Sequence, residues 1–127
     1  MSIRVHFKQS RVFCAVGIAL LFFMALFHGS GLFFVNDVIM KSNTEGFLKA
    51  IFPVLFIHPS IHLIGLSIFG ILAIHLREKA QTILIAIAIL VVADALAAFY
   101  LGAFAPGILL TIAAICFLIP GLGPKKL

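Results

Sequence analysis

Four long apolar segments alternate with short polar stretches along the chain. They cover approximately residues 12–35, 50–76, 82–101 and 103–120. A bilayer core about 30 Å thick is crossed by about 20 helical residues at roughly 1.5 Å each. Strands would leave backbone groups without partners in lipid, so the segments are predicted to be helices. The pattern therefore predicts one all-α domain, residues 1–127, folded as an integral membrane four-helix bundle.

The fourth segment is the shortest of the four. It reaches spanning length only if it begins near Gly102 or Ala103, ahead of Pro106. A version with three spans would leave Lys125 and Lys126 on the outer side, where basic residues are disfavoured. We therefore expect four complete crossings.

The first segment follows three basic residues, an arrangement that resembles a signal peptide. The run from Val12 to Val35 is, however, about twice as long as a typical signal h-region. It also lacks a clear small-x-small cleavage site ahead of polar sequence. We expect this segment to be retained as an uncleaved signal anchor.

Composition supports lipid as the main solvent of the chain. Hydrophobic residues make up 64% and charged residues 10%, against roughly 45–50% and about 25% in ordinary soluble domains. The net charge of +5 is not concentrated in a patch, because the basic residues sit at the ends of the apolar segments. This distribution favours a membrane protein and excludes nucleic acid as a partner.

The basic residues also predict the orientation in the membrane. Lys and Arg gather on the cytoplasmic side of multi-pass proteins. Lys41 and Lys49 would lie on one side, and the remaining seven basic residues on the other: Arg4, Lys8, Arg11, Arg77, Lys79, Lys125 and Lys126. With four spans, both termini are predicted to be cytoplasmic, in the cell inner (plasma) membrane.

Small residues and two cysteines lie within the apolar segments. Small side chains allow close helix approach in membranes, and they recur at Gly17, Gly29, Gly31, Gly65, Gly70, Ala86, Ala93 and Ala97. Cys14 and Cys116 are far apart in sequence and have no second cysteine nearby. We interpret both thiols as small apolar groups rather than a redox pair or metal ligands.

Four polar side chains fall inside the predicted spans: His28, His58, His62 and Asp94. Counting along the helices places Asp94 roughly 18 Å from its inner end and His58 roughly 12 Å from its outer end. In a core of about 30 Å these two depths coincide. His62 would lie one turn deeper and His28 about one turn shallower. The four residues are therefore predicted to form one polar centre.

Pro59 lies between the two histidines of the second segment. Proline donates no backbone hydrogen bond and crowds the carbonyl four residues earlier, so a kink is expected between Leu55 and Pro59. Pro53 is interpreted as a helix-start proline, a position where the missing N–H costs nothing.

Several roles are open to the polar centre. Asp94 is predicted to point into the bundle and to hydrogen-bond His58 or His62, since an unpaired acid at this depth costs about 2.5–3.5 kcal/mol. Such a pair can be purely structural, or it can relay protons. His58 and His62 could hold a transition metal, with Asp94 or His28 as the third ligand. His28 with a histidine of the second segment could instead bind haem.

Enzymatic function has little support in the sequence. Ser30, Ser60 and Ser67 supply hydroxyl groups, but none lies in a nucleophile elbow. The sequence contains no phosphate-binding loop, zinc-protease motif or dinucleotide fingerprint. The polar stretch 36–49 is the only sizeable extramembrane element.

In size, span count and charge placement the chain resembles small bacterial four-helix membrane proteins such as the DoxX-like group. The resemblance includes no diagnostic motif, and it assigns no functional residue. The small size and the near absence of extramembrane domains favour a non-enzymatic subunit or accessory, either a homo-oligomer or bound to other membrane subunits. The alternatives are a haem- or metal-binding redox protein and a proton-coupled small-solute carrier.

Overall fold

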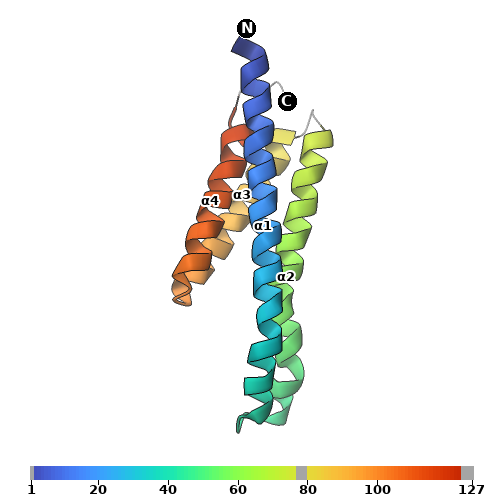
Figure 1. Ribbon diagram of the computed structural model, residues 1–127, viewed down its shortest axis with the longest axis vertical. Helices are drawn as coiled ribbons and strands as arrows, with labels where there is room; N and C mark the ends of the chain where they lie inside the picture. The colour runs from blue at the N-terminus through green and yellow to red at the C-terminus, as the bar shows by residue number, and fades with distance from the viewer. Residues whose placement is uncertain (1, 77–79, 124–127) are drawn as a thin grey trace.

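The computed structural model describes residues 2–76 and 80–123, with side chains described from Ser10 onward. It contains four helices: α1 (Ser2–Lys41), α2 (Gly46–His75), α3 (Ala80–Tyr100) and α4 (Phe104–Gly121) (Figure 1). The described residues contain no strand. Each helix is long and apolar enough to cross a membrane. The prediction of four long apolar helices is therefore confirmed.

The helices run alternately down and up, so the start of α1 and the end of α4 lie at the same end of the bundle (Figure 1). Arg11 lies at this end, beside Ile74 and Pro120. Lys41 and Lys49 lie at the opposite end, where α1 meets α2. The other basic residues in the predicted cytoplasmic set fall outside the described residues or the described side chains: Arg4, Lys8, Arg77, Lys79, Lys125 and Lys126.

The connection between α1 and α2 is much shorter than the sequence suggested. Instead of a loop over 36–49, only residues 42–45 lie outside the two helices. An ion pair of 2.6 Å joins Lys41 Nζ to Asp37 Oδ2, four residues earlier on the same helix. Lys49 Nζ also donates to the Met40 carbonyl at 3.0 Å, across the connection. Polar residues mark where an apolar run ends, but they do not interrupt helical backbone hydrogen bonds, so most of the polar stretch 36–49 is helical.

The turn between α3 and α4 is closed by backbone hydrogen bonds. Gly102 has a φ of +75°, the left-handed conformation that glycine adopts without a steric penalty. Its N–H donates to the Phe99 carbonyl, and the Ala103 N–H donates to the Ala98 carbonyl at 2.8 Å. This is the Schellman pattern that commonly ends helices. Helix α4 then begins at Phe104, one residue after the predicted start, with Pro106 tolerated in its first turn.

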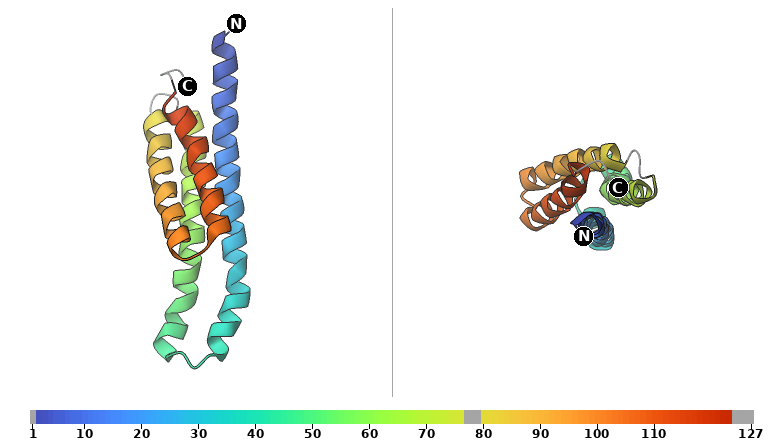
Figure 2. Two further views of the ribbon diagram at one scale, coloured as in Figure 1. Left: turned by 90° about the vertical axis from the view of Figure 1, so that its left-hand side faces the viewer. Right: turned by 90° about the horizontal axis from the view of Figure 1, so that it is seen from above.

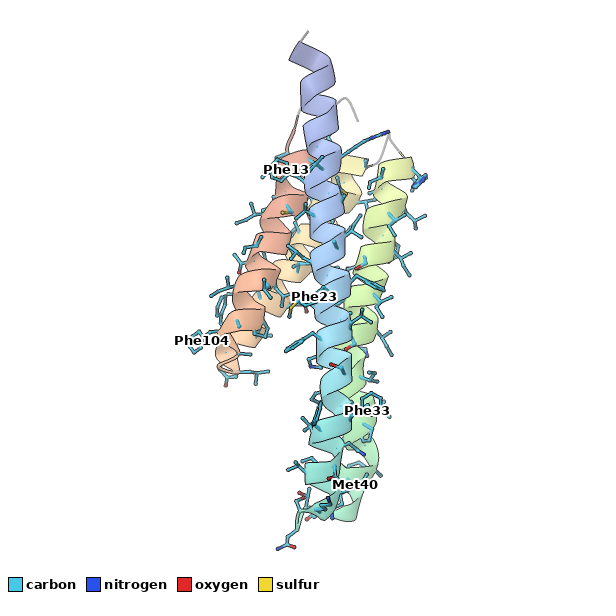
Figure 3. All side chains as sticks on the ribbon, in the orientation of Figure 1. Phe13, Phe23, Phe33, Met40 and Phe104 are labelled. Carbon is cyan, nitrogen blue, oxygen red and sulfur yellow. The ribbon has the colours of Figure 1, made fainter. Side chains whose placement is uncertain are left out.

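The α1–α2 hairpin extends well beyond the α3–α4 hairpin (Figure 2). His62 of α2 contacts Asp94 of α3, so antiparallel counting places the end of α3 at Tyr100 beside about residue 56 of α2. The ten residues 46–55 therefore project about 15 Å further, at roughly 1.5 Å per residue. Figure 3 shows Phe33 and Met40 on this projecting part, and Phe104 at the end of the shorter hairpin.

The four helices form a ring in which α1 contacts α2 and α4, and α3 contacts α4 and α2 (Figure 2). The α2–α3 contact is the least extensive of these four. At the centre lies Phe117 of α4, which is fully buried. A Cβ added at Gly17 of α1 would lie 2.9 Å from the Phe117 ring, and one added at Gly70 of α2 would lie 3.2 Å from it. Two glycines thus form the socket for one aromatic ring.

Only some of the predicted small residues mediate helix contacts. Gly17, Gly29 and Gly70 do so, because an added Cβ at each would lie within 3.3 Å of a neighbouring helix. Gly65 has no atom within 4 Å of the corresponding position. The three alanines predicted to pack on α3 are exposed in this chain: Ala86, Ala93 and Ala97. The packed face of α3 instead carries Leu84, Ala88 and Ala95.

The close packing of Phe117 against Gly17 predicts that a larger side chain at position 17 lowers the stability of the bundle. Gly17→Ala places a methyl group against a ring that has no free space, and overpacking of this kind typically costs about 1–3 kcal/mol. We expect a lower midpoint of thermal unfolding in detergent. Gly31→Ala is the matched control, because its added Cβ would lie 3.5 Å from the Phe56 ring, an ordinary van der Waals distance. Equal midpoints for the two variants would contradict the socket.

Candidate functional site

The most notable polar contact joins α2 to α3. His62 Nε2 lies 3.3 Å from Asp94 Oδ2. The distance suits an ion pair, but the two groups are not aligned for a hydrogen bond, and Asp94 Oδ2 has no hydrogen-bond partner within the described part of the chain. The side chains are only partly covered, with exposed fractions of 36% for His62 and 32% for Asp94. The pair therefore lies at the edge of the bundle rather than in its core.

His58 is exposed and lies one turn further out than the pair. Counting residues from the predicted helix ends placed His58, rather than His62, level with Asp94. That count took α2 and α3 to end at the same height, whereas α2 begins at Gly46 and projects beyond α3. This projection shifts the depth of every α2 residue relative to α3. Asp94 therefore faces His62, the second of the two partners considered.

His28 contacts a different partner on a different side of α2. Its Nδ1 lies 3.2 Å from Ser60 Oγ, and its ring stacks on Phe56 with centroids 4.6 Å apart. Ser60 is buried, and its hydroxyl packs close to Gly29, which has no side chain in the way. Here the glycine beside the histidine marks a tight helix crossing between α1 and α2.

Helical geometry explains why the predicted single centre divides into two pairs. Successive residues of an α-helix are turned by about 100°, because one turn takes 3.6 residues. Ser60 and His62 therefore point about 200° apart, one toward α1 and the other toward α3. The four predicted residues share a region of the bundle, but α2 separates His28 from Asp94.

Pro53 and Pro59 both lie inside α2, which continues as one helix through them. Pro53 was predicted to start the helix, but it is the eighth residue, because α2 begins at Gly46. The carbonyls of Lys49 and Leu55 lose the N–H donors that a non-proline residue would supply. The kink at Pro59 stays a prediction.

The described residues contain no group of three or more His, Cys, Asp or Glu side chains placed to hold a metal ion. Of the proposed metal ligands His58, His62 and Asp94, the structure brings only the last two together. Cys14 and Cys116 are both free and buried, and the Cys14 thiol lies 3.8 Å from the Gly70 carbonyl. The arrangement thus offers a two-residue pair rather than a ligand set.

The chemistry available at the His62–Asp94 pair is proton exchange and hydrogen bonding. An imidazole and a carboxylate at this distance can share a proton. Each side chain also keeps an uncovered portion. The pair can therefore interact simultaneously with its partner in the chain and with a group outside it.

Sequence reasoning missed the part played by Ser60, which was considered only as a possible nucleophile. Its role follows from its pairing with His28, and pairing across a helical hairpin depends on where the hairpin turns. Once the turn is placed at residues 42–45, antiparallel counting puts Ser60 opposite His28. Ser67 is likewise buried, and it donates to the Leu63 carbonyl of its own helix at 2.9 Å.

Comparison of the chain with protein-family models, curated proteins and solved structures gave no match.

The contact between His62 and Asp94 predicts a measurable coupling. Polar pairs between membrane helices contribute around 0.6 kcal/mol on average. We expect about this coupling energy from a double-mutant cycle of His62→Leu and Asp94→Leu, read from unfolding in mixed micelles. The control cycle pairs His58→Leu with Asp94→Leu and should be additive, because His58 is exposed one turn away. Coupling to His58 rather than to His62 would show that the assignment is wrong.

Proposed function

We propose that this chain is a small multi-pass protein of the inner (plasma) membrane, with both termini in the cytoplasm, and that it acts as a non-enzymatic subunit or accessory of a membrane assembly. Four helices long and apolar enough to span a bilayer support the membrane location. Arg11 at the end that carries both termini supports the orientation, since basic residues favour the cytoplasmic side.

The observation that carries the assembly role is the incomplete cover of the His62–Asp94 pair. About a third of each side chain is uncovered. In a bilayer these portions would face hydrocarbon, where an acid at the centre of the membrane costs about 2.5–3.5 kcal/mol. Ionisable residues in membrane helices almost always face a protein interior or water. A neighbouring subunit over the α2–α3 contact would supply that cover.

The unequal lengths of the two hairpins support a particular depth in the bilayer. The tip of the α1–α2 hairpin carries Asp37, Lys41, Glu45 and Lys49, whereas the α3–α4 turn, residues 100–105, carries no charge. Below the charged tip, the projecting part exposes apolar side chains such as Phe33 and Leu55. The membrane surface thus fits the charged tip, and the α3–α4 turn lies within the outer half of the bilayer.

Mild extraction from the native membrane tests the assembly role. We expect the chain to migrate in a complex larger than one protomer in native electrophoresis, and Asp94→Leu to reduce the share of chain in that complex. His75→Leu, which changes an exposed histidine near the other end of the same helix, should leave the complex unchanged. A wild-type chain that runs as a monodisperse monomer would contradict the proposal.

Cysteine labelling tests the topology independently. In a background lacking Cys14 and Cys116, Asn43→Cys should react with an impermeant maleimide added to intact cells. Leu122→Cys should react only after the membrane is permeabilised. Ala103→Cys should react in neither condition, because the α3–α4 turn lies within lipid. Labelling at position 103 as fast as at position 43 would place the membrane surface at the α3–α4 turn instead.

A further inference from the structure

The exposed surface along the α2–α3 contact combines polar groups with small residues. We call it the α2–α3 face and define it by His62, Gly65, Ala86, Asp94 and Ala97. Gly65 follows His62 by three residues, and Ala97 follows Asp94 by three, spacings that place each pair on one side of its helix. Ala86, two turns before Asp94, shares that side. Gly65 has no neighbour within 4 Å of its Cβ position, and the alanines are exposed. Another helix can therefore approach this face closely.

The polar groups of the α2–α3 face are not saturated within the chain. Neither carboxylate oxygen of Asp94 accepts a hydrogen bond within the described part of the chain, and because Oδ2 is covered, Oδ1 is the oxygen that a partner can reach. His62 makes only the ion-pair contact through Nε2 among those residues. One protomer thus presents a potential donor and an unfilled acceptor side by side. A partner must present the same two groups in complementary positions.

We propose that the partner is a second copy of this chain, bound through the α2–α3 face around a two-fold axis along the membrane normal. The inference rests on the membrane placement proposed above. A closed symmetric dimer of two copies inserted in the same orientation has its two-fold axis along the membrane normal, and residues at equal depth then meet. His62 and Asp94 lie at equal depth because they contact each other within the protomer. The axis therefore brings His62 of each copy opposite Asp94 of the other.

This arrangement is self-complementary in charge, as a two-fold interface requires. It gives each carboxylate a second imidazole and covers the uncovered thirds of both side chains. Like charges also meet across the axis, but each carboxylate then has two histidines beside it. Other faces at the same level do not offer this complementarity: α4 presents the apolar Ile108 and Ile112 there.

The dimer is tested first by cross-linking of the full chain in membranes. In the background lacking Cys14 and Cys116, Ala97→Cys should form a disulfide-linked dimer on mild oxidation. Ile108→Cys is the matched control, because Ile108 is exposed on α4 near the level of Phe99 but on a different face of the bundle. Cross-linking at position 108 and not at 97 would overturn the proposed interface.

Dimer affinity supplies a quantitative test by energy transfer between labelled protomers in phosphatidylcholine vesicles diluted with lipid. Asp94→Leu removes two symmetry-related contacts, and we expect about sevenfold weaker dimerisation, or about 1.2 kcal/mol. His75→Leu should leave the affinity unchanged, because His75 is exposed near the other end of α2 and points away from the α2–α3 face. An unchanged affinity for Asp94→Leu would show that the pair does not contribute to the interface.

A trans-complementation experiment separates contacts between copies from contacts within one. Asp94→His and His62→Asp each leave like groups on the α2–α3 face, so each variant alone should dimerise weakly. Mixed together, the two variants should form heterodimers, because the histidines of one copy then meet the carboxylates of the other. Loss of affinity without recovery on mixing would mean that the pair acts only within its own protomer.

The outcomes distinguish this inference from the proposed function. A wild-type chain that stays monomeric in vesicles but migrates in a larger native complex would overturn the homodimer and retain the assembly role, with a different subunit on the α2–α3 face. A chain that is monomeric in both experiments would overturn both proposals.

Discussion

The packing of the bundle depends on one aromatic ring held between two glycines. Phe117 projects from α4 into the space that Gly17 of α1 and Gly70 of α2 leave open. These three residues, far apart in sequence, bring α1, α2 and α4 together at this point, and α3 joins them through its extensive contact with α4. In lipid, helix association cannot depend on the hydrophobic effect, so close packing of this kind is the main source of attraction. The ring fixes how deep α4 lies against the α1–α2 hairpin.

That depth determines which polar side chains meet. With Phe117 placed level with Gly70, the α3–α4 hairpin ends well before the α1–α2 hairpin does. Asp94 consequently reaches the level of His62 and stops short of His58. The position of the acid is thus set by an apolar contact about two turns away. The loosest helix contact in the ring, between α2 and α3, is also the one that carries the charge.

Hydropathy predicted the four helices and their order, because apolar length alone decides which segments can span a bilayer. It did not predict where helices end, because Asp37 and Lys41 stay helical although they are charged. Hydropathy also did not show which small residues pack against a neighbouring helix. Gly70 packs and Gly65 does not, and the difference lies in which face of α2 turns toward α1 and α4. The pairing of His28 with Ser60 needed the position of the hairpin turn, a relation between two helices that periodicity within one helix does not contain.

The backbone of the α3–α4 turn has a consequence for how the chain is made. The N–H groups of Leu101, Gly102, Ala103 and Phe104 all donate to backbone carbonyls, at 2.8 to 3.1 Å. Such a turn keeps its donors satisfied without water, and it has no charge to carry across hydrocarbon. In the proposed membrane arrangement, α3 and α4 can enter the bilayer together as a closed hairpin from the cytoplasmic side. During biosynthesis, the connection between α1 and α2 is then the only loop whose charged residues must be moved across the bilayer.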